Sequence, residues 1–165
     1  MSAIFPTNTN YANRQVDVEL LQTVTQPANL VPVTVSTVRT APKMVTGIEK
    51  LVQRYTLLLL THTGTVHFDQ AQGGDLLTLV FGGYVQDAGQ LNYAFASANS
   101  IVVAALYAED INTDVYGVVP DDEQISSATL LDAQVDRNTA TAYLRIRINS
   151  KAGTSFEFVV PVTKK

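Results

Sequence analysis

The sequence contains no cysteine and few charged residues, and each shortage excludes a class of protein. Without cysteine there is no disulfide framework, thiolate nucleophile or cysteine-bound zinc, so side-chain packing must stabilise the fold. Charged residues make up 16% of the 165 residues, whereas roughly 25% is usual for soluble domains. With a hydrophobic content of 46%, this shortage of charge favours a protein that buries much of its surface in an assembly.

The sequence also lacks an excess of positive charge and a long apolar run. Its formal net charge is -4, and no cluster of Lys and Arg is interleaved with aromatic residues, so nucleic acid is not an expected partner. The longest apolar run, Ile101 to Ala108, is far shorter than the roughly twenty residues of a membrane-spanning helix. The first residues do not resemble a secretory signal. We therefore expect no membrane partner and a chain that stays in the cytoplasm.

The length suits one hydrophobic core with an appendage. We assign residues 1–46 to an N-terminal arm and hairpin extension, and residues 47–165 to the main domain. Residues 1–13 are rich in Asn, Thr and Ala without a period, which is typical of an arm without regular structure.

Two short strands are predicted in the rest of this extension. Apolar and acidic residues alternate from Val16, which predicts a half-buried strand that ends near Val24. A turn follows at Gln26 to Asn29. The next strand, residues 31–35, contains Pro32 and is expected at an edge, because proline cannot donate to a central ladder. The pattern predicts a β-hairpin that residues 40–43 link to the main domain.

The main domain begins with a predicted helix, a turn and a glycine-rich loop. The apolar residues of the helix share one face of a 3.6-residue period: Ile48, Leu51, Val52, Tyr55, Leu58 and Leu59. Polar residues fall mainly on the other face: Glu49, Lys50, Gln53 and Arg54. A turn at residues 61–65 precedes a short strand at residues 66–68. After Gly73 and Gly74, Asp75 is expected to cap a short helix that stops at Gly82 and Gly83.

A second long helix and three strands complete the predicted domain. The helix runs from about Gly89 to Glu109, and a loop follows to Asp121. The strands are separated by turns at residues 136–138 and 150–153. Their inward residues are expected to be Ile125, Thr129, Leu131, Ala133 and Val135, then Leu144, Ile146 and Ile148, then Phe156, Phe158, Val160 and Val162. The fold class is α+β: a three-strand C-terminal antiparallel meander packed by two to three helices, with an N-terminal β-hairpin extension.

Two patterns bear on metal binding. His62 and His67 lie near Asp69, but this spacing lacks a helical His pair, and polar turn residues are the better interpretation. The segment from Asp110 to Asp121 has acidic residues at several positions of a calcium loop, but Val115 occupies the place where that loop needs glycine. We therefore predict neither a metal nor a cofactor.

Acidic residues 121–123 raise the question of glycoside cleavage, which uses a pair of carboxylates. That chemistry needs one acid in an apolar pocket and the other across a sugar-sized cleft, and a run of adjacent acids is more typical of a solvated loop. The paired glycines lack the lysine of a phosphate-binding loop and are explained by helix boundaries. We predict no catalytic residue.

The order of elements carries a resemblance. The elements concerned are Gln53-Arg54 in the first helix, the run from Leu57 to Thr61, Gly64, and the loop from Gly73 to Leu76. In this order the chain is similar to the small baseplate wedge, or sheath-initiator, proteins of contractile-tailed bacteriophages. That family is related to a component of the type VI secretion baseplate.

The resemblance extends over Thr46 to Val162 and has a second part. Family members carry a Glu-Pro-Arg-Ile signature before three strands, and here Asp122, Glu123, Gln124 and Ile125 stand in that place. Only Ile125 is identical, so the arginine contact of the signature is not carried over.

The resemblance implies a structural subunit of the virion, assembled in the host cytoplasm into the tail baseplate. Its expected partners are other wedge proteins, the tail sheath protein, and tail tube or hub proteins. The strand from Thr154 to Val162 is the expected edge for strand addition. The alternatives are another tail assembly protein, such as a terminator or connector, and a lysozyme-like glycoside hydrolase.

We predict the interface residues from the segment at residues 122–124, from the outward face of the middle strand, since Arg and Tyr concentrate at interface hot spots, and from the strand Thr154 to Val162 itself. They are Asp122, Glu123, Gln124, Tyr143, Arg145, Arg147, Phe156 and Phe158. Keeping that face soluble is the alternative role of its charged members.

Overall fold

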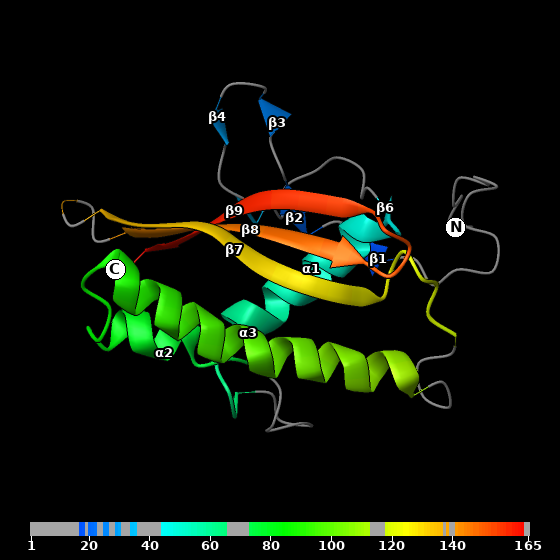
Figure 1. Cartoon of the computed structure of the whole chain (residues 1–165), viewed down its shortest axis with the longest axis horizontal. Helices are drawn as coiled ribbons and strands as arrows, with labels where there is room; N and C mark the ends of the chain where they lie inside the picture. Colours follow the sequence, from blue (N-terminus) through cyan, green and yellow to red (C-terminus); the bar gives the residue numbers. More distant parts are fainter. Residues whose placement is uncertain are drawn as a thin grey trace, which may run out of the picture.

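Three helices and a three-stranded antiparallel sheet form the main body of the computed structural model (Figure 1). The helices are α1 (Ile48–Leu60), α2 (Leu76–Phe81) and α3 (Ala88–Ile111), and the strands are β7 (Ile125–Asp136), β8 (Thr141–Ser150) and β9 (Ser155–Thr163). The structure describes residues 17–18, 20–22, 25–26, 29–30, 34–35, 44–65, 73–112, 118–136, 138 and 141–163. The predicted α+β class, meander and helices are therefore confirmed.

The N-terminal extension forms a hairpin of three nested antiparallel pairs. They are β1 (Asp17–Val18) with β6 (Met44–Val45), β2 (Leu21–Gln22) with β5 (Thr34–Val35), and β3 (Thr25–Gln26) with β4 (Asn29–Leu30). The predicted hairpin is confirmed. The predicted arm at residues 1–13, Pro32 and the link at residues 40–43 lie outside the described residues.

The predicted burial of the first strand is wrong. Val18 is 42% exposed and Leu20 is 38% exposed, so these two apolar side chains face solvent, while Val16 lies outside the described residues. Asp17 instead faces the main domain, where its carboxylate accepts a hydrogen bond from Gln53 of α1 at 3.0 Å. Asp17 points toward α1 because the part of α1 that meets this strand carries hydrogen-bonding groups and not an apolar surface.

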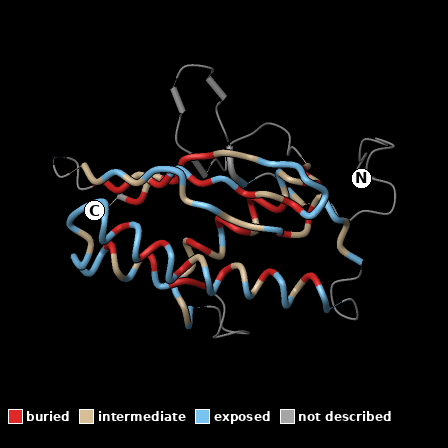
Figure 2. The backbone as a smooth tube through the Cα atoms, in the orientation of Figure 1, coloured by how far each residue is buried: buried red, intermediate tan, exposed pale blue. Residues whose placement is uncertain are grey.

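The core lies between the helices and one face of the sheet. Leu51, Tyr55 and Leu59 of α1 pack with Leu91 and Leu106 of α3, and all five side chains are fully buried. In Figure 2 buried stretches recur along α3 once per turn, as expected of a helix that covers a sheet. Burial of each large side chain contributes roughly 1.5 to 3 kcal/mol.

α3 is the helix that covers β7 (Figure 1). Among the described helices it is long and apolar enough, by length and composition, to span a membrane, and 33% of its most apolar window is buried inside the molecule. Core helices of soluble proteins meet the same criterion. Its N-terminus is capped by Asp87, whose carboxylate accepts a hydrogen bond from Gln90 N–H at 2.8 Å.

The loop before α2 depends on a close approach of two backbones. Gly73 has φ of 108°, and a Cβ at this position would lie 2.5 Å from the carbonyl oxygen of Thr61. Gly74 N–H donates to that carbonyl at 2.8 Å. The predicted cap by Asp75 is wrong, because Asp75 is the N-cap of α2 but its side chain makes no capping hydrogen bond. The predicted strand at residues 66–68 lies outside the described residues.

Two register shifts in β7 change which of its residues face the core. They lie between Ile125 and Ser127, and between Leu130 and Asp132. Each extra residue moves the following side chains to the opposite face. The inward set is therefore Ile125, Ala128, Leu130, Ala133 and Val135. The predicted inward positions of Thr129 and Leu131 are wrong, and Leu131 is 37% exposed.

Candidate functional site

The outward face of the sheet carries a charged cluster in which two arginines share one carboxylate. Arg145 and Arg147 of β8 have side chains 43% and 45% exposed, and both pair with Glu157 of β9. Arg145 Nη2 donates to Glu157 at 2.9 Å, and Arg147 Nε does so at 2.9 Å. The hydrogen bond from Arg147, and to a smaller extent the one from Arg145, holds the pKa of Glu157 below its usual value.

Glu157 is therefore a member of this face that the sequence-based prediction missed. The signal for it was present, because Glu157 alternates with the inward residues Phe156 and Phe158. Its partner required the register of the sheet, which places Arg147 directly opposite Glu157.

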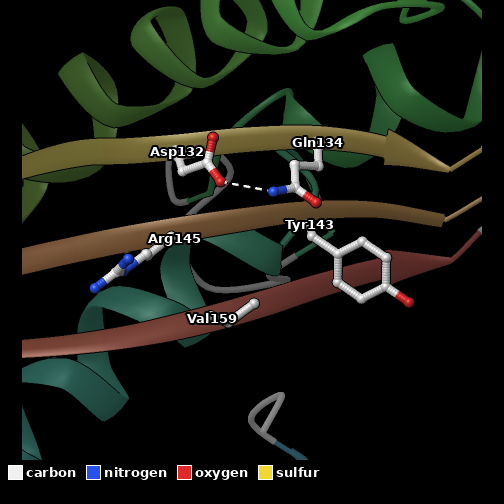
Figure 3. Close-up of a pocket in the computed structure, with 5 residues that line it drawn as sticks. All are labelled: Asp132, Gln134, Tyr143, Arg145 and Val159. Atoms are coloured by element: carbon white, nitrogen blue, oxygen red, sulfur yellow. Dashed lines mark hydrogen bonds between the residues drawn. The ribbon is translucent and has the colours of Figure 1, made fainter. Parts of the chain in front are cut away.

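A shallow hollow of about 300 Å³ lies beside this cluster on the same face (Figure 3). Its described lining residues are Asp132, Gln134, Tyr143, Arg145 and Val159. Asp132 accepts hydrogen bonds from its neighbour Ala133 N–H at 2.9 Å and from Gln134 Nε2 at 2.8 Å. In Figure 3 the Arg145 guanidinium points away from Asp132, so the hollow has an acidic wall and an aromatic wall. Such a surface suits the polar or basic side chain of a protein partner.

The two edge strands of the sheet differ in how their outer backbone groups are used. On β7, side chains of α3 reach the strand: Tyr107 Oη donates to the Ser126 carbonyl at 2.8 Å, and Asn99 Nδ2 donates to the Ala128 carbonyl at 3.3 Å. α3 therefore covers part of the β7 edge. No strand in the described part of the chain pairs with the outer edge of β9.

The turn before β9 fixes which of its backbone groups point outward. Ser150 N–H donates to the Thr154 carbonyl at 2.9 Å, and β9 then pairs with β8 without a register shift. In an antiparallel ladder, hydrogen-bonded pairs alternate with pairs whose backbone groups point away from the neighbour. By this alternation, the N–H groups that point to the open edge are those of Ser155, Glu157 and Val159. Pro161 has the same orientation, so its missing N–H interrupts no bond to β8.

The predicted interface segment at residues 122–124 lies against the start of α1 and the turn after β8. Glu123 is 1% exposed, and its carboxylate accepts from Lys50 Nζ at 2.9 Å and from Gly47 N–H at 3.1 Å. Gln124 accepts from Lys151 Nζ at 2.6 Å through its side-chain carbonyl. A Cβ on Gly47 would lie 2.9 Å from Asp122 Oδ2, so this segment packs tightly on the helix terminus.

The two predicted phenylalanines face the core. Phe158 is 2% exposed, Phe156 is half-buried against the core, and their ring centroids are 6.4 Å apart. Of the eight predicted interface residues, the structure brings Tyr143, Arg145 and Arg147 together on the outward face. Glu123 and Phe158 have no appreciable surface in this chain.

Gln53 and Arg54 join the elements of the fold, although both were expected on the polar side of α1. Gln53 is 2% exposed, and its amide bonds Asp17, the Val18 carbonyl and the Leu20 N–H at 2.7 to 3.0 Å. It therefore fastens the hairpin to α1. The expectation that the polar side of α1 faces solvent is wrong at this position, because the hairpin covers it.

Arg54 fastens the C-terminus of α3 and the start of β7. Its guanidinium donates to Glu109 at 2.8 Å, to Asp110 at 3.3 and 3.4 Å, and to the Glu123 carbonyl at 3.3 Å. Asp110 is buried and also accepts from Ile125 N–H at 3.3 Å. The first acidic residue of the calcium-like pattern is thus used inside the fold.

The other metal candidate is only partly described. His62 is exposed, and its Nδ1 lies 2.6 Å from the Thr63 carbonyl, while His67 and Asp69 lie outside the described residues. Among the residues whose positions are given, no group of three or more His, Asp or Glu is arranged to hold a metal ion.

In comparisons with known proteins, no family model matches the sequence and no curated protein matches it significantly.

Proposed function

We propose that this chain is a structural subunit of the baseplate wedge of a contractile phage tail. In this role it accepts an extended segment of a neighbouring subunit, such as the sheath protein, at the outer edge of β9. The proposal combines the resemblance in the order of elements from Thr46 to Val162 with the physical properties of the sheet.

The observation that carries the proposal is the difference between the two edge strands. The β7 edge is engaged by Tyr107 and Asn99 of α3, whereas the β9 edge has no strand partner in the described part of the chain. An unpaired edge with outward N–H and C=O groups is a template for an incoming strand. The outward N–H groups of Ser155, Glu157 and Val159 allow an added strand to pair over about five residues of β9. Pro161 has no N–H and ends this stretch.

The charged cluster supplies the means of selecting the partner. Side chains of an added strand that face the outside of the sheet would lie next to Glu157, one strand from Arg145 and Arg147. Cross-strand pairs of opposite charge contribute roughly 0.2 to 1 kcal/mol each, and like charges disfavour pairing. The backbone thus provides affinity, and the cluster disfavours strands of the wrong charge pattern.

Two substitutions at residue 157 separate the contribution of the backbone N–H to partner binding from that of the side chain. Glu157→Pro removes an outward N–H donor and keeps the β8 ladder, whereas Glu157→Thr keeps the donor and loses the same ion pairs. We expect both variants to fold, and we expect only Glu157→Pro to weaken binding of the sheath or wedge partner, by about tenfold or more. Phe158→Pro is the contrasting variant, because its N–H points to β8 and its loss should unfold the sheet.

Assembly of purified sheath protein onto baseplates that contain each variant is the measurement, with circular dichroism to check folding. A folded Glu157→Pro variant that primes sheath growth as well as Glu157→Thr would contradict strand addition at this edge. A tail terminator or connector is the rival in the same class, and closed rings formed by the purified chain alone would favour it. Peptidoglycan cleavage that Glu123→Gln abolishes in a folded protein would favour the hydrolase.

A further inference from the structure

The register of the sheet sets two pairs of opposite charge on its outer face. Asp132 of β7 lies directly opposite Arg145 of β8, and Arg147 of β8 lies directly opposite Glu157 of β9. Side chains directly opposite each other in an antiparallel pair are close enough to interact, and opposite charges there favour pairing. The register alone therefore predicts one arginine for each carboxylate.

Arg145 departs from this arrangement. Its Nη2 donates to Glu157 at 2.9 Å, so Glu157 has two arginines. Asp132 accepts hydrogen bonds from Ala133 N–H and Gln134 Nε2, and within the described part of the chain no cation forms an ion pair with it. Figure 3 shows the Arg145 guanidinium pointing away from Asp132. One carboxylate thus has two cations, and the other has none.

The hollow beside Asp132 has space for the Arg145 guanidinium. Its volume is about 300 Å³, and Gln134, Tyr143 and Val159 line it together with these two residues. The Arg145 side chain is 43% exposed, so the core does not block rotation about its bonds. In the hollow its guanidinium would bond the Asp132 carboxylate and lie beside the Tyr143 ring. Arg145 therefore has two positions, each with one carboxylate to bind.

We propose that the strand added at β9 carries a lysine or arginine opposite Glu157, and that Arg145 then moves to Asp132. This inference rests on the proposed strand addition. The Glu157 side chain is 31% exposed, and a residue paired with Glu157 on the added strand lies directly beside it. The new cation and Arg147 then share Glu157, while Arg145 binds Asp132. Both carboxylates are paired only in this state.

The other classes of partner residue do not produce this exchange. An acidic residue opposite Glu157 would place like charges directly across the two strands, which disfavours pairing. An uncharged residue would leave Arg145 on Glu157 and Asp132 without a cation. Asp132 therefore acts on the choice of partner through Arg145, as a positioning residue, although β8 and β9 separate it from the added strand.

The expected preference is modest, because these ion pairs are exposed to water. Exposed pairs contribute little each, so we expect a basic residue to raise the affinity about fourfold over an uncharged one. Glu157→Thr should lose the same fourfold for a partner that carries this cation. That loss is smaller than the tenfold or more expected of Glu157→Pro.

A designed peptide serves as the probe of this preference. It has seven residues, two threonines and a valine on each side of a central residue, with blocked ends. The central residue is lysine, glutamate, or norleucine, which keeps an apolar stem without the ammonium group. Each peptide is titrated into the isotope-labelled full chain at about 0.15 M salt, and the amides of Ser155, Glu157 and Val159 are followed by NMR. The lysine peptide should bind about fourfold more tightly than the norleucine peptide, and the glutamate peptide should bind most weakly.

Three variants test the role of Asp132. Asp132→Asn should reduce the lysine preference to less than twofold and leave binding of the norleucine peptide unchanged. Asp75→Asn is the matched control, because Asp75 is exposed on α2 and its side chain makes no capping hydrogen bond; it should keep the fourfold preference. Arg145→Gln removes the residue that moves, so adding Asp132→Asn to it should not change the preference further. Circular dichroism checks that every variant is folded.

The outcomes separate this inference from strand addition itself. If the norleucine peptide shifts the three β9 amides but lysine gives no gain, or if Asp132→Asn keeps the full gain, the exchange is refuted and strand addition stands. An effect of Asp132→Asn that persists in the Arg145→Gln background shows direct attraction of the cation by Asp132 and refutes the movement of Arg145. If no peptide shifts these amides, strand addition at β9 fails, and this inference fails with it.

Discussion

Replacing Arg54 by Met should destabilise the fold more than any exposed charge substitution. Arg54 is the cation that faces Glu109 and Asp110 at the C-terminal end of α3, where the helix dipole already disfavours negative charge. The Asp110 side chain is 0% exposed, so in Arg54→Met its carboxylate would lose the guanidinium and keep the hydrogen bond from Ile125 N–H at 3.3 Å.

The expected magnitude follows from the burial of the two partners. Removing one partner of a buried ion pair costs roughly 3 to 5 kcal/mol. Arg54 and Glu109 are 20% and 21% exposed, so water can solvate Glu109 and the lower end applies. A loss of about 3 kcal/mol lowers the melting temperature by about 6 to 12 °C in a chain of this size. That is a large part of a total stability of about 5 to 15 kcal/mol.

Urea unfolding followed by circular dichroism is the assay, with a shift of the midpoint at constant slope as the expected result. Asp110→Asn should lose about 1 to 2 kcal/mol, and the double variant should lose less than the sum by about 1.5 to 3 kcal/mol. Loss of less than about 1 kcal/mol in Arg54→Met, or strict additivity in the double variant, would refute the assignment of Arg54 to a buried pair.

Three further outcomes are expected. Gly73→Ala should lower the free energy of unfolding by well over the roughly 1 kcal/mol expected for Gly153→Ala. Both glycines have a positive φ, but only at Gly73 would a Cβ meet a backbone atom, at 2.5 Å. Equal melting temperatures of the two variants would contradict this. Because the pKa of Glu157 is lowered on folding, the stabilisation from its ion pairs is present above the unfolded pKa of about 4.3 and is lost as pH falls through the folded pKa. A carboxyl NMR titration should show this pKa rising in Arg147→Gln, and an unchanged value would count against the ion pair. Burial raises the pKa of Tyr55 far above its usual value, so alkaline absorbance titration of the folded protein should leave one of the 7 tyrosines protonated until unfolding, unlike in Tyr55→Phe.

The positions of helices and strands followed from local patterns in the sequence. The periodic leucines and valines of α1, the long stripe of α3 and the alternation in β8 and β9 placed these elements within a few residues of their bounds. The predicted turn at residues 150–153 contains Gly153, which adopts a positive φ of 81° that favours glycine.

The faces of β7 did not follow from its pattern. Simple alternation predicts one inward set for a whole strand, but each bulge shifts that set by one residue. The adjacent Leu130 and Leu131 were a signal, since two consecutive apolar residues cannot both face the core of an unbroken strand.

The sequence by itself determined the α+β class, the order of the elements, the hairpin and the outward direction of Tyr143, Arg145 and Arg147, because each depends on residues close together along the chain. Only the tertiary structure decided that Gln53 holds the hairpin, that Glu123 pairs with Lys50, and that α3 engages the β7 edge. These contacts join residues about 30 to 70 positions apart. No periodicity reports which distant groups will meet, because that depends on how the layers pack.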